Sequence, residues 1–109
     1  VVGASKQDLA LLLLEAVQKA DGKEALRLLK EGADPNLGDD VGETPLFEAA
    51  SMGDMDIAAA LLVHSADPSH KSTASMQPIQ LAEDEGMKAL LRLFMGETVE
   101  SSEKAAALE

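Results

Sequence analysis

Cysteine, tryptophan and tyrosine are absent from this sequence, and two phenylalanines make up its whole aromatic content of 2 %. Without cysteine, the chain has neither a disulfide framework nor a cysteine-ligated zinc site. Hydrophobic residues are nevertheless 46 % of the chain, so its core must be mainly aliphatic. Such a core suits short, close-packed helices better than a β-sandwich, whose strands favour β-branched and aromatic residues.

Basic residues and long apolar runs are also scarce. Nine lysines and arginines stand against twenty acidic residues, which gives a formal net charge of −11. An acidic surface repels phosphate, so we expect neither nucleic acid nor a membrane as a partner, and a basic protein or peptide fits better. The longest apolar run, Leu9–Leu14, is far shorter than the roughly 18 residues that span a bilayer.

Both ends of the chain are expected to lie outside the folded unit. The sequence begins at Val1 without methionine, which is consistent with removal of an upstream segment. Residues 98–109 are predicted to form a tail that is disordered over residues 101–104. Its last residues, Ala105–Glu109, resemble the remnant of a cloning vector and carry no weight in the fold argument.

A repeat of 33 residues organises the rest of the chain. The segment LLKEGADPN, residues 28–36, returns as LLVHSADPS at residues 61–69. Further matches at the same offset are Glu15 to Glu48, Ala16 to Ala49, Pro45 to Pro78, Gly53 to Gly86, Ile57 to Leu90 and Leu61 to Phe94. So many matches at one offset predict three copies of one structural unit.

Each copy is predicted to fold as a helix, a tight turn, a second helix and a loop. In the middle copy Thr44 is the expected N-cap, Pro45 takes the first helical position, and Gly53 ends the helix. Asp54 or Asp56 opens the next helix. The apolar residues fall on one face of each helix: Leu46, Ala49 and Ala50, then Ile57, Ala58, Leu61 and Leu62. The proline of the ADPS segment is expected to end the second helix.

Helices of two turns cannot hold themselves together in water, so each must be buried by its equivalents in neighbouring copies. The predicted fold class is therefore all-α, a solenoid of three stacked helix-turn-helix repeats with irregular terminal repeats. Leu61 lies in the shared apolar stripe and is expected in the core.

The segment from Asp39 to Ser69 resembles the ankyrin repeat, whose pattern runs G-x-T-P-L-H-x-A-A, then glycine, then L-L-x-x-G-A-D. The matching residues are Gly42, Thr44, Pro45, Leu46, Ala49, Ala50, Gly53, Leu61, Leu62, Ala66 and Asp67. The resemblance covers about Ser5–Gly96. It implies an N-terminal capping repeat at residues 5–38, a central repeat at 39–71 and a C-terminal capping repeat at 72–97.

Departures from the family pattern mark the capping repeats. The first copy has the run LLLLEA in place of Thr-Pro, after a Ser5–Asp8 capping box, which indicates a longer first helix. The third copy has Ser75 for glycine, Gln77 for threonine and Glu83 for the second alanine. With Asp84 and Glu85, Glu83 is expected to make the first helix of this copy polar and outward-facing.

Two departures in the middle copy affect its turns. Phe47 replaces the family's histidine, which normally ties neighbouring turns by hydrogen bonds. Ser65 replaces the usual helix-ending glycine. Asp34 and Asp67, by contrast, are expected to accept backbone N–H bonds and shape the turns that follow the second helices.

No catalytic or metal-binding constellation is visible in the sequence. It contains no P-loop, no G-x-G-x-x-G segment and no nucleophile motif. His64 and His70 flank Asp67, but nothing pins them in a fixed geometry, so we interpret both as solvated loop residues. The leucines of the run at 9–14 are interpreted as core or capping contacts, with an exposed patch for a partner as the alternative. We predict no catalytic residue, no metal and no cofactor.

The resemblance implies that partners bind along one concave side, formed by loop tips and the exposed face of the first helices. The equivalent residues here are Gln18 and Lys19 in the first copy, Asp40, Val41, Glu43, Ser51 and Met52 in the second, and Thr73, Ala74, Met76, Asp84 and Glu85 in the third. The methionines are adaptable apolar contacts, and the carboxylates around them suit lysine or arginine on a partner.

The leading hypothesis is a non-enzymatic module that binds a basic peptide, loop or helix in this concave groove. One alternative is a regulatory or assembly domain cut from a larger enzyme or adaptor, and another is a free-standing inhibitor or chaperone of a basic client. We expect a monomer, although the methionines and leucines leave weak self-association open. We also expect an intracellular protein, cytoplasmic or nuclear, with an organelle left open.

Overall fold

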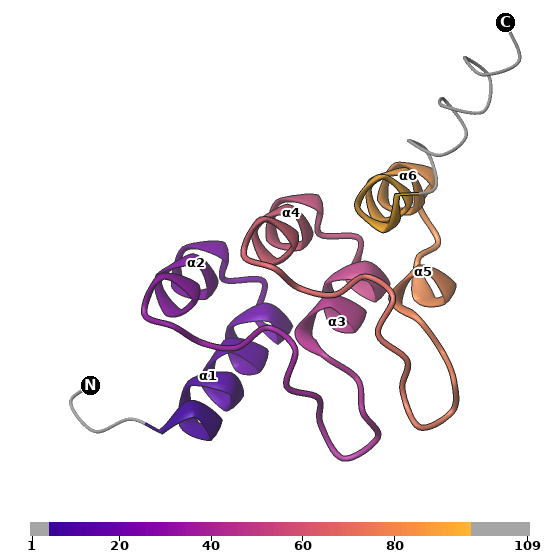
Figure 1. Cartoon of the computed structure of the whole chain (residues 1–109). Helices are drawn as coiled ribbons and strands as arrows, with labels where there is room; N and C mark the ends of the chain where they lie inside the picture. The colour runs from indigo at the N-terminus through magenta and orange to yellow at the C-terminus, as the bar shows by residue number, and fades with distance from the viewer. Residues whose placement is uncertain (1–4, 97–109) are drawn as a thin grey trace, which may run out of the picture.

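A computed structural model of the chain describes residues 5–96, which form six helices and no strand (Figure 1). The helices are α1 (Lys6–Gln18), α2 (Gly22–Lys30), α3 (Pro45–Met52), α4 (Met55–Val63), α5 (Pro78–Leu81) and α6 (Glu85–Met95). One row contains α1, α3 and α5, and a second row contains α2, α4 and α6. The predicted all-α solenoid is confirmed. The tail predicted at residues 98–109 lies outside the described residues.

The terminal helix pairs are irregular, as predicted. In the first row α1 has 13 residues, α3 has 8 and α5 has only 4. The Ser5–Asp8 capping box is present, with the Asp8 amide donating to Ser5 Oγ at 3.0 Å and the Ser5 amide donating to Asp8 Oδ2 at 3.3 Å. This reciprocal cap starts the longer first helix at Lys6.

Aspartate caps start every helix of the second row. Asp21, Asp54 and Asp84 each accept a hydrogen bond from the backbone amide three residues on, at 3.1, 3.1 and 3.2 Å. Asp54 rather than Asp56 therefore opens α4. A carboxylate at this position also opposes the positive end of the helix dipole.

Thr44 corrects one expectation. It occupies the N-cap position of α3 and Pro45 follows at the first helical position, but the threonine side chain makes no capping hydrogen bond. Thr44 is 2 % exposed and its Oγ1 has no hydrogen-bond partner among the described residues. Proline supplies the helical φ angle without a cap, so α3 begins without help from the hydroxyl.

The second-row helices end through left-handed residues rather than through the prolines that we expected. α4 ends at Val63, whereas Pro68 comes five residues later. Ser65 takes φ 76°, and the next amide, of Ala66, donates back to the carbonyl of Leu61 at 2.9 Å. Gly32 (φ 104°) closes α2 in the same way, 33 residues earlier. This motif satisfies carbonyls that the helix leaves open.

The apolar core runs between the two rows and answers how helices this short are stable. α1 contacts α3, α3 contacts α5, α2 contacts α4, and α4 contacts α6, so each inner helix is covered by its equivalents on both sides. The fully buried residues, all at most 1 % exposed, include Leu13, Val17, Ala25, Leu28, Leu46, Phe47, Ala49, Ala50, Ile57, Ala58, Leu61, Met87 and Leu91. Alanines at helix contacts allow the close approach.

The third helix pair departs from the 33-residue register. Gly86 was matched to the helix-ending Gly53, yet it lies inside α6, because Asp84 caps that helix three residues early. Glu83, Asp84 and Glu85 therefore do not lie on the first helix of this pair, as we expected, but on the turn into α6 and at its start. Phe94, matched to the buried Leu61, is 43 % exposed.

The leucine run of α1 is only partly a core element. Leu13 is completely buried, and Leu9 and Leu14 are half-buried. Leu11 and Leu12 are 62 % and 40 % exposed, so the expectation of core or capping contacts is wrong for these two. For them the alternative of an exposed apolar patch fits the structure.

Candidate functional site

Two loops with the same backbone pattern project beyond the first row of helices (Figure 1). We call residues 37–44 the first loop and residues 70–77 the second loop. In the first, the Asp39 amide donates to the Glu43 carbonyl at 2.9 Å. In the second, the Ser72 amide donates to the Met76 carbonyl at 2.9 Å, again 33 residues on. These short bonds close each loop into a hairpin shape.

A side chain at the base of each loop reinforces it. Asp39 Oδ1 accepts the amides of Val41 and Glu43 at 3.0 and 2.9 Å. In the second loop, Ser72 Oγ takes this place and accepts the equivalent amides, those of Ala74 and Met76, both at 3.3 Å. The loops are thus ordered by their own side chains, which is how Asx turns and their serine counterparts work.

The second loop is tied to the first at a contact that we call the second junction. The Thr73 amide donates to the Val41 carbonyl at 2.9 Å, and the Thr73 hydroxyl donates to the same oxygen at 3.2 Å. His70 Nε2 lies 3.0 Å from the Gly42 carbonyl, and since a carbonyl only accepts, Nε2 carries the proton. His70 also meets the Phe47 ring edge-on, with centroids 6.2 Å apart.

His70 is therefore a structural residue and not the solvated loop residue that we expected. Phe47 occupies the position of the family's histidine, and it is 1 % exposed. The inter-loop hydrogen bond that this departure removes is supplied by His70 from the opposite side. Gly42 permits the contact: its φ is 78°, and a Cβ there would lie 3.3 Å from backbone atoms of Ser72 and Thr73.

Asn36 joins the helix pairs on the side away from the loop tips. Its Nδ2 donates to the Ser65 carbonyl at 2.9 Å, and its Oδ1 accepts the Asp67 amide at 2.7 Å. The turn roles predicted for Asp34 and Asp67 are confirmed, because each Oδ1 accepts the amide two residues on at 2.8 Å. The bases of both loops are fixed by these contacts.

The first loop meets α1 at the equivalent contact, which we call the first junction, and there a pocket remains. The 33-residue register pairs Lys6–Leu11 of α1 with residues 39–44 of the first loop, so a helical extension stands where a loop would be. Leu14 takes the place of Phe47, and Leu37 that of His70. The pocket has a volume of about 300 Å³ and is lined by Gln7, Ala10, Leu11, Leu14, Leu37, Gly38 and Asp39.

The predicted partner-binding residues fall into three places. Asp40, Val41 and Glu43 lie in the first loop, with Thr73, Ala74 and Met76 beside them in the second, and Val41 and Thr73 are directly bonded. Ser51 and Met52 end α3, while Gln18 ends α1 and Lys19 caps it. α3 rises from the first loop, so the Ser51 and Met52 backbone lies roughly 10 Å along the helix from its start.

The remaining two predicted residues do not join this group. Asp84 caps α6 through the Met87 amide at 3.2 Å, and Glu85 is the first residue of that helix. Exposure supports the others: Val41 is 48 % and Met52 40 % exposed, and only Met76 is half-buried among the apolar members.

The pocket at the first junction was missed by the sequence analysis. Leu37, Gly38 and Asp39 were treated as an ordinary loop, and Leu14 as core. A usable signal existed: Leu11 and Leu37 are apolar where the repeat offset pairs them with Thr44 and His70.

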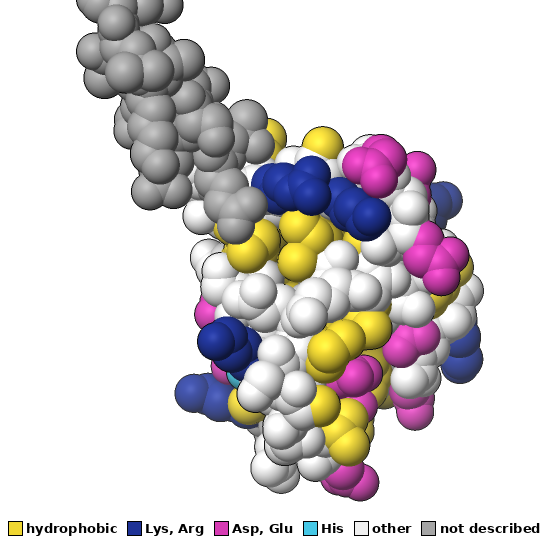
Figure 2. Space-filling view, turned by 90° about the vertical axis from the view of Figure 1, so that its right-hand side faces the viewer, with side chains coloured by type: hydrophobic (Ala, Val, Ile, Leu, Met, Phe, Trp, Pro, Cys, Tyr) yellow, Lys and Arg dark blue, Asp and Glu magenta, His cyan; other side chains and the backbone are white. Residues whose placement is uncertain are grey.

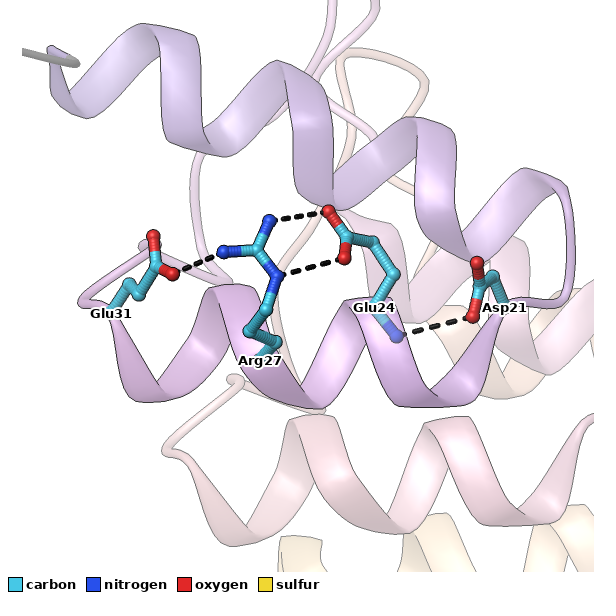
Figure 3. A network of polar contacts seen from close by, with 4 residues as sticks. All are labelled: Asp21, Glu24, Arg27 and Glu31. Carbon is cyan, nitrogen blue, oxygen red and sulfur yellow. Dashed lines mark hydrogen bonds and ion pairs between the residues drawn. The ribbon is translucent and has the colours of Figure 1, made fainter. Parts of the chain in front are cut away.

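A charged network lies on α2, away from both loops (Figure 3). Arg27 donates to Glu24 through Nε at 2.8 Å and through Nη2 at 2.6 Å, and Nη1 contacts Glu31. The hydrogen bond from Arg27 holds the pKa of Glu24 below its ordinary value, against the opposing effect of desolvation. The same pairing raises the pKa of Arg27. This arginine is therefore matched within its own helix.

The end of the solenoid formed by α5 and α6 has a different character (Figure 2). Basic side chains lie across α6 above a group of hydrophobic ones; the basic residues of this helix are Lys88 and Arg92. Lys88 pairs with Glu85 at 3.4 Å. The strongly negative charge of the chain is thus not spread evenly, and the carboxylates of the first loop lie apart from this basic end.

The described residues offer neither a metal cluster nor a membrane span. Over residues 5–96, no three histidine or acidic side chains gather in a way that could hold an ion. Over the same range, no helix has the length and apolar character needed to cross a bilayer.

Comparison with known proteins identifies the repeat. The family model of ankyrin repeats matches residues 13–102 in three copies. The chain is 41 % identical over 71 residues to a mouse 2-5A-dependent ribonuclease, which covers 64 % of the chain and 10 % of that protein. It is 35 % identical over 81 residues to the ARF GTPase-activating protein Git of Drosophila melanogaster, covering 73 % and 11 %. It is 39 % identical over 66 residues to the potassium channel AKT1 of Arabidopsis thaliana, covering 61 % and 8 %. The chain spans about a tenth of the length of these relatives.

Proposed function

Because the chain belongs to the ankyrin-repeat family, whose repeats generally serve as protein-interaction modules, we propose that it binds a basic peptide, loop or helix of a protein partner without catalysing a reaction. The proposed surface, which we call the loop–helix strip, contains Gln18, Lys19, Asp40, Val41, Glu43, Ser51, Met52, Thr73 and Met76. It combines the two loops with the exposed ends of α1 and α3.

The observation that carries this proposal is the second junction. Two loops that hold each other through Thr73, Val41 and His70 are already ordered before a partner arrives. Binding to such a surface loses little conformational entropy, which leaves more of the contact energy as affinity. An ordered loop pair that exposes apolar side chains is thus suited to recognition.

The chemistry of the strip favours a basic partner. Val41 is 48 % exposed and stands between Asp40 and Glu43 in the first loop, and Met52 is 40 % exposed at the end of α3. The carboxylates attract lysine and arginine over about a Debye length, roughly 8–10 Å at physiological salt. Charges at an exposed rim mainly speed association, whereas buried apolar contacts mainly slow dissociation.

The test begins with affinity capture of a partner and continues with association kinetics at several salt concentrations. Asp40→Lys should slow association and flatten its salt dependence. Asp56→Lys is the matched control, since it makes the same charge change at an exposed site on α4, and neither carboxylate makes a hydrogen bond among the described residues. Equal effects of the two variants, or association that ignores salt, would place the partner elsewhere.

A second candidate follows from the length of the relatives. Their printed names describe a ribonuclease, a GTPase-activating protein and a potassium channel, and the matched segment is about a tenth of each. We propose as the alternative that this unit acts as a regulatory or assembly domain inside a larger protein. The length of the parent gene separates this arrangement from a free-standing module.

A further inference from the structure

The two junctions occupy equivalent positions but differ in what fills them. At the second junction, the Phe47 ring and the His70 imidazole meet, and His70 and Thr73 bond to the first loop. At the first junction, Leu14 and Leu37 stand in those places and leave the pocket of about 300 Å³. The repeat thus shows which group is missing: a bulky, flat or branched apolar side chain between the loop and the helix.

We propose that this pocket binds one bulky apolar side chain of the partner, next to a basic residue of the same segment. This inference rests on the proposed function, because it assigns an anchor position at the α1 end of the same surface. The occupant is a phenylalanine-sized or leucine-sized side chain flanked by arginine or lysine.

The size and lining of the pocket favour a single side chain. An apolar cavity of roughly 150 Å³ is large enough to hold a benzene ring, so this volume accommodates a phenyl or isobutyl group with room for its backbone. Ala10, Leu11, Leu14 and Leu37 form apolar walls. Leu11 and Leu37 are 62 % and 39 % exposed, so an occupant would remove apolar surface from water on both sides.

The charge around the pocket favours the basic neighbour. Residues 5–14 and 37–43 contain four carboxylates, Asp8, Asp39, Asp40 and Glu43, against the single ammonium group of Lys6. Asp39 lines the pocket and uses Oδ1 for the Val41 and Glu43 amides, which leaves Oδ2 to accept a charged donor. A cationic group here meets complementary charge within one residue of the apolar anchor.

The experiment titrates the full chain with short capped peptides, followed by the methyl NMR signals of the leucines and methionines. The first peptide is acetyl-Gly-Arg-Phe-Arg-Gly-amide, and its matched control has alanine for phenylalanine. The phenylalanine peptide should shift the Leu11, Leu14 and Leu37 methyls and bind about tenfold more tightly than the alanine peptide, the ratio expected for burying one large apolar side chain. A third peptide, with glutamate for both arginines, should bind several-fold more weakly.

Two variant pairs locate the anchor. Ala10→Phe should fill the pocket and abolish the preference for the phenylalanine peptide, whereas Ala89→Phe adds the same ring at an exposed position of α6 and should leave it unchanged. If Ala10→Phe fails to fold, Leu11→Ala and Leu12→Ala serve instead. Leu11 lines the pocket and Leu12 does not, so only the first should weaken binding, by about threefold to fivefold.

The possible failures are distinguishable. If both arginine peptides shift only Val41, Met52 and Met76, with equal affinity, the pocket inference is wrong and the loop–helix strip stands. If the pocket methyls shift with protein concentration and no peptide, the occupant is a second copy and the inference is wrong in its partner. If none of the peptides shifts any of these signals, the basic-partner proposal fails together with the pocket.

Discussion

The first and second junctions share one architecture but have opposite surfaces. Both place a 33-residue equivalent of the same loop against a first-row helix or the loop before it. An aromatic ring, an imidazole and a threonine close the second junction, while two leucines leave the first one open. The difference shows that, in this solenoid, a few side chains decide whether an interval between repeats becomes a rigid contact or a binding pocket.

The largest expected effect comes from the residue that fills the second junction. Phe47 is 1 % exposed, whereas its equivalent Leu14 is half-buried beside the pocket. Phe47→Ala should lower the free energy of unfolding by roughly 3–5 kcal/mol, as large-to-small core changes do. Leu14→Ala should cost clearly less, because that side chain already faces open space. Urea unfolding followed by circular dichroism measures both, and equal losses would mean that the junctions are not packed differently.

Converting one junction toward the other gives a smaller effect. His70→Leu installs the residue found at Leu37 and removes both the bond to the Gly42 carbonyl and the edge-on contact with Phe47. We expect a loss of roughly 1–2 kcal/mol of unfolding free energy and faster amide exchange at Thr73. The matched change, Leu37→Ala, affects a side chain that is 39 % exposed and should cost less than half as much. Unchanged exchange at Thr73 would show that His70 does not hold the loops together.

The helix ends that precede the two loops provide the third comparison. Gly32 closes α2 before the first loop, and Ser65 closes α4 before the second, both with positive φ. A side chain in this conformation costs roughly 1 kcal/mol, so Ser65→Gly should stabilise the fold by about that amount. Gly32→Ser should destabilise by a similar amount, since a Cβ at Gly32 meets no atom within 4 Å and only the backbone term changes. A stabilising Gly32→Ser would contradict this account. Thermal unfolding of both variants is the measurement.

The smallest effect lies away from both junctions and sets the baseline. Arg27→Met removes the partner that lowers the pKa of Glu24, so this pKa should rise toward its ordinary value in a carboxylate NMR titration. A lowered folded-state pKa favours folding above the unfolded-state pKa, and this contribution is lost as the pH falls through the folded value. The variant should therefore lose that small acid-dependent component without changing either junction. An unshifted Glu24 would show that the pair is not formed in solution.

The sequence predicts the fold well because the repeat is written in residues with strong backbone preferences. Pro45, Gly53 and Asp54 appear where a helix starts, stops and starts again, and each does so in the structure. The third copy resisted the same reasoning. There Asp84 competes as a cap with the position expected from the repeat, and it wins three residues early, which carries Gly86 into α6. Counting at a fixed offset cannot detect a better local cap.

The candidate site was predicted less completely. The loop residues Asp40, Val41 and Thr73 lie together, but their partner-binding role stays a prediction. The role of His70 was not foreseen, because it compensates for Phe47 from another repeat, and such a pair can be recognised only when the two loops are seen side by side. The pocket depends on volume that Leu14 and Leu37 do not fill, and volume is a property of packing rather than of a motif.

The amide of Asn36 has a consequence for the ageing of this protein. Its nitrogen faces the Ser65 carbonyl at 2.9 Å, and its oxygen receives the Asp67 amide at 2.7 Å, so one side chain imitates a peptide group between two helix pairs. Hydrolytic deamidation would replace that nitrogen by a carboxylate oxygen. Two acceptors would then face each other, and a further negative charge would join a chain that already carries −11. A single spontaneous chemical event at Asn36 would loosen the joint between the first two helix pairs without any change in the gene.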